Sequence, residues 1–101
     1  MESPVPLALA LPEILLHEQA VGCLQQLTVR LQSSGAAGAE APRDWVIDAS
    51  ALRDFDSSAL AVLLACRRSA HGLGGTLRVQ GLPAALRELA SVYGVLELLG
   101  A

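Results

Sequence analysis

Apolar residues form two kinds of pattern along this chain, and each pattern predicts a different secondary structure. Spacings of three and four residues predict helices over 18–32 and 57–70, whereas short apolar runs predict strands at Trp45–Ala49 and Thr76–Gly81. The glycine-rich segment 71–75 is suited to ending the second helix. A strand, a helix and a strand in this order and length predict a βαβ unit, with parallel strands joined by a right-handed crossover.

The patterns are shorter on both sides of this unit. Leu7–Ala10 and Glu13–Leu16 predict two short strands, and Pro12 between them predicts a sheet edge or a turn because proline donates no ladder hydrogen bond. After the last long strand, Pro83 in a first turn predicts a third helix that Gly94 stops. We expect the buried face of that helix to hold Leu86, Leu89, Ala90 and Tyr93. The type of the apolar element Val95–Leu99 stays open.

These elements predict one α/β domain over residues 1–101, with a small mixed sheet of about four strands and helices mainly on one face. A chain of 101 residues supports one core rather than two. Residues 33–42 are rich in small residues and end in Pro42, which predicts a flexible loop that acts as a tether.

Composition narrows the choice of partners. Lysine is absent, the formal net charge is -3 and the arginines are scattered, so we expect no nucleic-acid partner. No apolar run approaches the roughly 20 residues of a membrane span, and the apolar segment Val5–Leu16 lacks the basic start of a signal peptide. We therefore expect a cytoplasmic protein without direct membrane insertion, in which Cys23 and Cys66 are buried thiols.

The second predicted helix is apolar on more than one side. At about 100° per residue, Leu60, Leu63 and Leu64 form one stripe, which we expect to pack on the sheet. The opposite stripe is small and apolar, and it comprises Ser58, Val62, Ala65 and Ser69, with Ala61 and Cys66 on the flanks. Because a helix that is apolar all round is usually covered on both sides, this stripe predicts a partner surface. Packing of the first or third helix over it is the alternative.

The turn Asp56-Ser57-Ser58 opens this helix and adds polar chemistry. Ser57 is the expected N-cap, alone or together with Asp56, and Ser58 is expected to point outward. A phosphate on Ser58 would place negative charge at a helix N-terminus, where the helix dipole tolerates it, and would repel an apolar or acidic partner. Caps without a switch are the simpler interpretation of both hydroxyls.

On these residues the chain resembles a STAS domain, the fold of bacterial anti-sigma-factor antagonists. The resemblance rests on the strand 46–50, the motif 56–60, the helix start 61–64, the strand 74–79 and the ending 89–95. In the antagonists the motif is Asp-Ser-Ser-Gly-Leu with its second serine phosphorylated, which corresponds to Ser58 here. In the MlaB-like branch the motif is Asp-Thr-Ala-Gly-Leu, and its threonine corresponds to Ser57. Ala59 stands where both motifs have glycine.

The MlaB-like branch is the closer resemblance, and it implies a function. Its members bind the cytoplasmic ATPase subunit of the Mla ABC transporter, which moves phospholipids between Gram-negative membranes and maintains outer-membrane lipid asymmetry. The resemblance thus implies a non-enzymatic accessory subunit, peripheral at the inner membrane through the transporter complex. The expected contact residues are Asp56, Ser57, Ser58, Ala61, Val62 and Ala65. The alternative is an antagonist that sequesters an anti-sigma kinase and is switched at Ser58, or at Ser57.

Catalytic and metal chemistry find little support in the residues. His17 and His71 are isolated, and neither serine has an evident histidine partner for a catalytic triad. Asp48, Asp54 and Asp56 do not follow the spacing of a known metal loop, so we expect turn and cap roles for them. We expect no catalytic residue, no metal and no cofactor.

Overall fold

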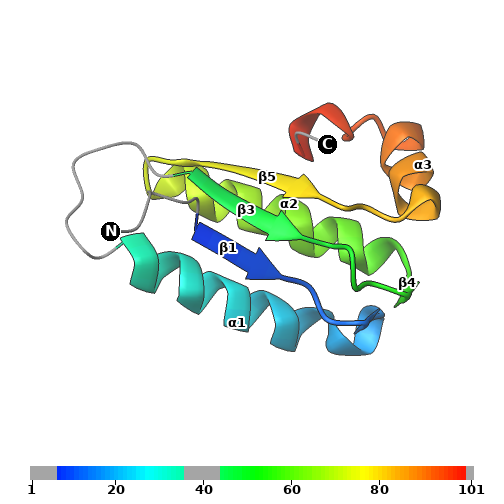
Figure 1. Ribbon diagram of the computed structural model, residues 1–101, viewed down its shortest axis with the longest axis horizontal. Coiled ribbons are helices and arrows are strands. Elements are labelled where there is room, and N and C mark those ends of the chain that lie inside the picture. Colours follow the sequence, from blue (N-terminus) through cyan, green and yellow to red (C-terminus); the bar gives the residue numbers. More distant parts are fainter. Residues whose placement is uncertain (1–6, 36–43, 100–101) are drawn as a thin grey trace, which may run out of the picture.

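The computed structural model describes residues 7–35 and 44–99 and shows an α/β fold, which confirms the predicted class. Figure 1 shows the elements, which follow one another as β1 (Leu7–Ala10), β2 (Ile14–Leu15), α1 (His17–Gly35), β3 (Asp44–Asp48), β4 (Asp54–Phe55), α2 (Ser57–Gly72), β5 (Thr76–Gln80), α3 (Ala84–Val92) and the 3-10 turn η1 (Glu97–Leu99).

The described strands form two parallel groups rather than one mixed sheet of about four strands. The main sheet has three strands in the order β1-β3-β5, with Leu9 beside Ile47 and Ile47 beside Val79. Strands β2 and β4 form a separate two-stranded parallel pair. The parallel βαβ unit is confirmed. The second group is separate because the chain leaves the sheet edge at Pro12, which cannot extend the ladder.

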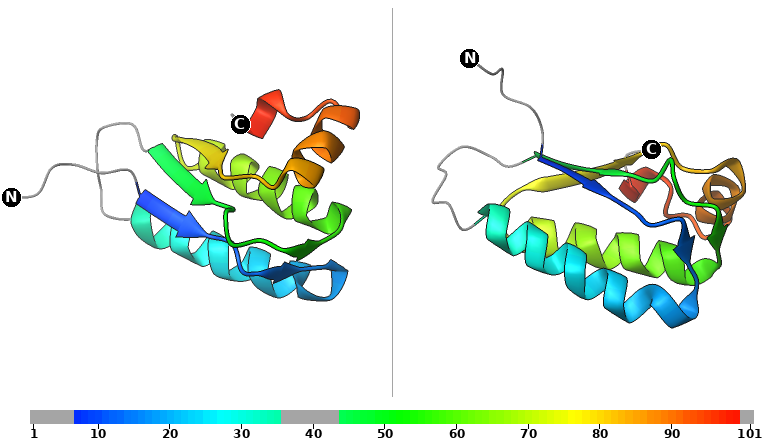
Figure 2. Two further views of the ribbon diagram at one scale, coloured as in Figure 1. Left: turned by 45° about the vertical axis from the view of Figure 1, so that its right-hand side comes forward. Right: turned by 60° about the horizontal axis from the view of Figure 1, so that its bottom comes forward.

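Two helices cover one face of the main sheet. In Figure 2, α1 and α2 lie side by side beneath the strands, and both run in the same direction. Residues of β5 alternate as this arrangement requires, because Leu77 and Val79 are buried whereas Arg78 between them is exposed. Trp45 and Ile47 in the central strand are completely buried, so the core lies between the sheet and this helix pair.

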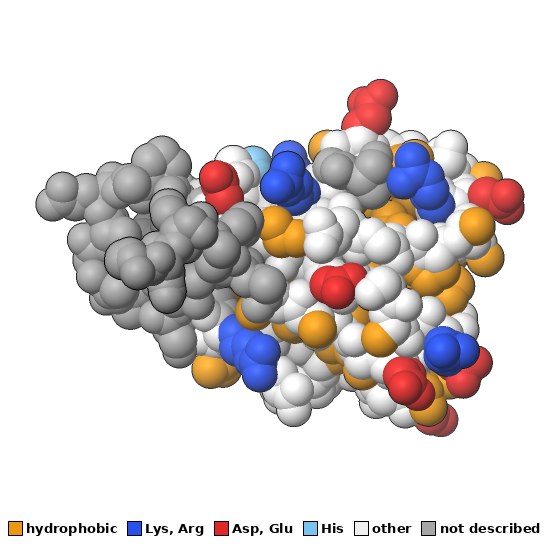
Figure 3. Space-filling model, viewed as in Figure 1, with side chains coloured by type: hydrophobic (Ala, Val, Ile, Leu, Met, Phe, Trp, Pro, Cys, Tyr) orange, Lys and Arg blue, Asp and Glu red, His pale blue; other side chains and the backbone are white. Residues whose placement is uncertain are grey.

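The opposite face of the sheet carries charged, polar and apolar side chains together, with Val46 of the central strand among them. Figure 3 shows this side of the molecule, on which acidic and basic side chains are interspersed without a field of one sign. The exposed residues of β5, namely Thr76, Arg78 and Gln80, point to this side.

The C-terminal elements pack against α2 and differ in detail from the prediction. Helix α3 begins after Pro83 and buries Leu86 and Ala90, but the predicted burial of Tyr93 is wrong because that side chain is 59% exposed. The helix ends at Val92, one residue before Tyr93. The chain then turns at Gly94, whose φ is 73°. Tyr93 therefore lies beyond the end of the helix, where helical periodicity no longer determines which side chains are buried.

The loop between α1 and β3 starts later in the sequence than its small residues predict. Helix α1 continues through Ser33 and Ser34 to Gly35, three residues into the predicted loop, and the rest of that loop lies outside the described residues. Within 7–35 and 44–99, no helix combines the length and the apolar character needed to cross a bilayer.

Candidate functional site

The first turns of α1 and α2 lie next to each other and share one carboxylate. Asp56 accepts a hydrogen bond at Oδ1 from the Ser58 N–H, at 2.8 Å, and at Oδ2 from the His17 N–H, at 3.1 Å. The first bond is an N-cap of α2, and the second satisfies a free donor at the start of α1. Asp56 is therefore the cap of α2, as the prediction of a role shared with Ser57 allowed, and the prediction that Ser57 itself caps the helix is wrong.

The small β2–β4 pair sets up this arrangement. Leu15 pairs with Phe55, so the helices that follow the two strands begin at the same level. The N–H groups of Arg53 and Asp54 donate to the Glu13 carbonyl at 2.8 and 3.0 Å and fix the approach. Two residues per strand thus suffice to hold two helix N-termini together.

The electrostatics of Asp56 follow from these donors. Hydrogen bonding from the Ser58 N–H, with smaller contributions from His17 and the Ser58 hydroxyl, holds the pKa of the Asp56 carboxyl below its ordinary value despite some desolvation. The carboxylate is ionised at neutral pH and places a negative charge where the positive ends of two helix dipoles converge.

The two serines of the motif are exposed in the reverse of the expected order. Ser57 is exposed, whereas Ser58 is half-buried and its N–H is hydrogen-bonded to Asp56. Ser58 stands on the flank of α2 that turns toward α1, one turn before Val62. Of the two candidate phosphoacceptors, Ser57 is thus the accessible one.

The predicted outer stripe of α2 is wrong at its centre. Val62 is only 2% exposed and belongs to the hydrophobic core, and Ala65 is half-buried. The reason is that α1 packs along this flank of α2, so the alternative of coverage by the first helix holds. Val62 consequently offers no surface to a partner.

The side of α2 that faces outward is rotated by about 100° around the helix axis from the side that the sequence predicted to face outward. It runs through Ser57, Ala61, Leu64 and Arg68, of which Ser57, Ala61 and Arg68 are exposed and Leu64 is half-buried. We call these four residues the outer stripe. Leu64 was placed on the inward stripe by the sequence, although Leu60 and Leu63 are buried as expected. Arg68, one turn after Leu64, is the sequence signal that marks the outward direction.

The remaining candidate residues do not assemble into a reactive centre. Burial raises the pKa of the Cys66 thiol to about 12, with a smaller contribution from nearby Cys23, and burial also raises the pKa of Cys23. Both thiols are therefore protonated and poorly nucleophilic at neutral pH. Cys66 is buried as predicted, while Cys23 is only half-buried.

Asp48 and Asp56 have the predicted turn and cap roles, whereas Asp54 is a strand residue. Asp48 accepts from the Ser50 N–H at 3.0 Å, and hydrogen bonds from Ser50 lower the pKa of its carboxyl. Asp54 pairs in β4, and His17 and His71 are exposed near opposite ends of the helix layer. No group of three or more potential metal ligands occurs within the described part of the chain.

Comparison with known proteins gives one finding. Residues 6–100 match the family model described as "Mlab, STAS domain", so the match extends over both helix starts, the main sheet and the C-terminal turn. No protein with a curated description matches the chain.

Proposed function

Because the chain belongs to the family of MlaB-like STAS domains, we propose that it is a non-enzymatic accessory subunit of an Mla-type phospholipid ABC transporter. In this role it binds the cytoplasmic ATPase subunit and supports the assembly and activity of the transporter, which maintains outer-membrane lipid asymmetry. The protein then resides in the cytoplasm, at the inner membrane through its partner.

The observation that carries this proposal is the outer stripe of α2. Its first three residues, Ser57, Ala61 and Leu64, are uncharged and accessible, and they begin directly at the family motif. A solvent-facing helix normally places charged side chains there. Small side chains at Ser57 and Ala61 also leave room for a partner backbone to approach closely.

A stable contact needs more surface than one stripe provides. Specific interfaces bury upwards of about 1,000 Å² in total. Helix α1 lies beside α2 and adds Val21, which is 68% exposed and lies one helical turn after His17. We therefore place the ATPase on the outer side of the helix pair, with Ala65 within the contact and Ser58 and Asp56 at its rim.

The alternative of a phosphorylation-switched antagonist gains no specific support. The serine that aligns with the antagonist phosphoacceptor is Ser58, which is half-buried and whose N–H donates to Asp56 at 2.8 Å. A kinase would have to reach a side chain that is partly covered, whereas docking on the outer stripe uses exposed positions such as Ser57 and Ala61.

The test is co-purification with the ATPase subunit encoded in the same genome. We expect Ala61→Arg to lower the affinity for the ATPase by about tenfold or more, because a long charged side chain at the centre of an apolar contact loses its hydration. The matched control is Gln80→Arg, which adds the same side chain at an exposed position on the opposite face of the sheet. This control should bind as the wild type does.

Circular dichroism must show native helix content for both variants, since both positions are exposed. Wild-type binding by Ala61→Arg would exclude the outer stripe as the docking surface. Failure of the wild-type chain itself to bind the ATPase would exclude the transporter role.

A further inference from the structure

The outer stripe of α2 ends in a cation that has no partner in the described part of the chain. Arg68 is exposed, and neither a hydrogen bond nor an ion pair engages its guanidinium there. The residues three and four positions away from it are Leu64, Ala65, His71 and Gly72, so no carboxylate has the spacing of a helical ion pair. Helix α2 contains no aspartate or glutamate at all.

The helix dipole does not account for this arginine. Cations gain from the dipole within the last turn of a helix, and the effect falls off beyond it. The basic residue in the last turn of α2 is His71, and Arg68 precedes that turn. Arg68 instead follows Leu64 by one turn, at the end of the uncharged part of the outer stripe. Its exposed charge therefore has no role within the described fold.

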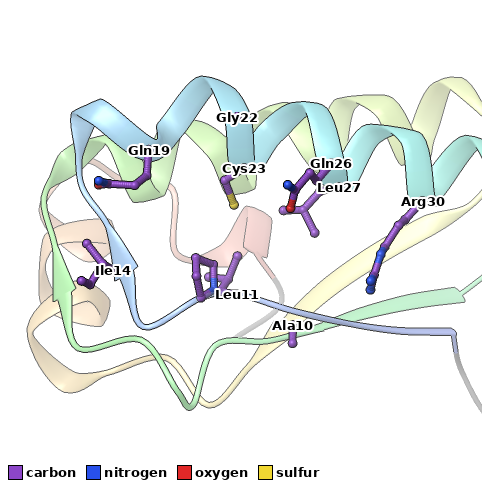
Figure 4. Close-up of a pocket in the computed structure, with 10 residues that line it drawn as sticks. Ala10, Leu11, Ile14, Gln19, Gly22, Cys23, Gln26, Leu27 and Arg30 are labelled. Atoms are coloured by element: carbon purple, nitrogen blue, oxygen red, sulfur yellow. The ribbon is translucent and has the colours of Figure 1, made fainter.

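The other arginines of the helix pair lie elsewhere. Arg30 points into the pocket between the end of β1 and α1, as Figure 4 shows, and it already has an interaction partner. Arg67 is half-buried and projects about 100° away from Arg68 around the axis of α2. Arg68 is therefore the arginine of α1 and α2 that is exposed on the outer stripe.

The opposite end of the helix pair is acidic. The one carboxylate within α1 and α2 is Glu18, in the first turn of α1, and Asp54 and Asp56 come just before α2. Arg53 offsets only one of these charges. Because α1 and α2 run side by side in the same direction, this acidic end lies at the start of the outer stripe (Figure 2). The two ends of the stripe are about 16 Å apart, which exceeds the Debye length of about 8 Å at physiological salt, so a partner meets two separate charges.

We propose that Arg68 selects and orients the ATPase by pairing with a carboxylate of that subunit. This inference rests on the proposed function, whose partner it specifies. An apolar surface of the ATPase lies on Ala61 and Leu64, and an aspartate or glutamate of the same surface lies one helical turn further, opposite the guanidinium. The reverse orientation would bring that carboxylate beside Glu18 and Asp54, where like charges repel each other. Charge complementarity thus determines which way round the ATPase docks.

Matched charge reversals in the full chain test this pairing. Arg68→Glu should lower the affinity for the ATPase by about tenfold or more at low salt, and about 0.5 M salt should reduce this loss by screening the repulsion. Arg78→Glu makes the same change of charge at an exposed position of β5, on the other side of the sheet, and should bind as the wild type does. Arg68→Lys should keep most of the affinity because it keeps the charge. Circular dichroism must show native helix content for all three variants.

The absence of lysine allows the carboxylate of the partner to be identified directly. Because the chain contains no lysine, Arg68→Lys introduces its only side-chain amine. A water-soluble carbodiimide joins an amine to a carboxylate that touches it, and peptide mass spectrometry of the linked complex then locates the aspartate or glutamate of the ATPase. We expect a cross-link from Arg68→Lys and none from the control Arg78→Lys.

The possible failures separate the pairing from the docking site. Equal affinities of Arg68→Glu and Arg78→Glu, or no cross-link from Arg68→Lys in a complex that forms, would overturn the pairing. If Ala61→Arg weakens binding while Arg68→Glu does not, the outer stripe docks the ATPase without this ion pair, and only the pairing is wrong. If the wild-type chain does not bind the ATPase, the proposed function is wrong and the pairing falls with it.

Discussion

Asp56 connects the two long helices through a single side chain. One oxygen accepts the Ser58 N–H and the other accepts the His17 N–H, 39 residues away in the sequence. A serine cap would have to accept both N–H groups at one oxygen, whereas the carboxylate presents a separate oxygen to each helix. The carboxylate therefore explains why an aspartate, rather than another capping residue, suits this position of the motif.

The lowered pKa of Asp56 gives a testable pH dependence. Because its folded-state pKa lies below the unfolded value, the carboxylate contributes stability above the unfolded pKa, near 4, and this contribution is lost as the pH falls through the folded pKa. We expect Asp56→Asn to melt below the wild type at pH 7, and the difference in melting temperature to shrink toward pH 3.

The control for this prediction is Asp54→Asn, which changes an exposed carboxylate two residues earlier. That variant keeps Asp56, so its melting temperature should fall toward acid pH as that of the wild type does. A difference between wild type and Asp56→Asn that is as large at pH 3 as at pH 7 would show that the charge of Asp56 does not stabilise the fold.

At the scale of the element, α2 has three different sides. Leu60 and Leu63 belong to the core, Val62 packs on the flank toward α1, and the outer stripe from Ser57 to Arg68 faces outward. Apolar residues occupy all three sides, so hydrophobicity alone does not distinguish the core from a docking surface. The positions of the neighbouring helices make that distinction.

Adjacent residues of α2 should therefore respond very differently to the same substitution. Val62→Arg buries an unpaired charge against α1 and should lower the free energy of unfolding by roughly 3 kcal/mol or more. Ala61→Arg, which projects outward, should stay within about 0.5 kcal/mol of the wild type. Urea unfolding followed by circular dichroism measures both values. A native-like midpoint for Val62→Arg would mean that this flank of α2 is open.

At the scale of the molecule, the layers leave different surfaces open. The sheet lies over the α1–α2 pair, the outer stripe faces away from the sheet, and a pocket between the end of β1 and α1 is lined by Ala10, Leu11 and residues of α1. Helix α3 and η1 pack against α2 and bury Leu86 and Leu99. All these parts join one hydrophobic core, in which Trp45 of the central strand is completely buried.

One shared core predicts one unfolding transition. Trp45 is the single tryptophan of the chain, so its fluorescence reports on the central strand, whereas circular dichroism at 222 nm reports mainly on α1 and α2. We expect the two signals to give the same urea midpoint and a slope of about 1–2 kcal/mol per molar urea. Loss of the helical signal at lower urea than the Trp45 signal would show that the helix pair unfolds separately.

The sequence by itself determined the elements and the family. Helical spacing located α1 and α2, and short apolar runs located β3 and β5, to within a few residues, because the pattern of apolar residues in an element reflects which of its sides is buried. The Asp56-Ser57-Ser58 turn was recognisable because N-capping is a local interaction with fixed spacing.

Only the tertiary structure decided which flank of α2 is free and what Asp56 bonds to. Helical periodicity gives the angles between side chains but not the position of a neighbouring helix, so Val62 was predicted to face outward although α1 covers it. The bond from the His17 N–H to Asp56 joins residues 39 positions apart, and it needs the first turns of α1 and α2 to lie beside each other. Such contacts depend on how the elements pack, which no local pattern encodes.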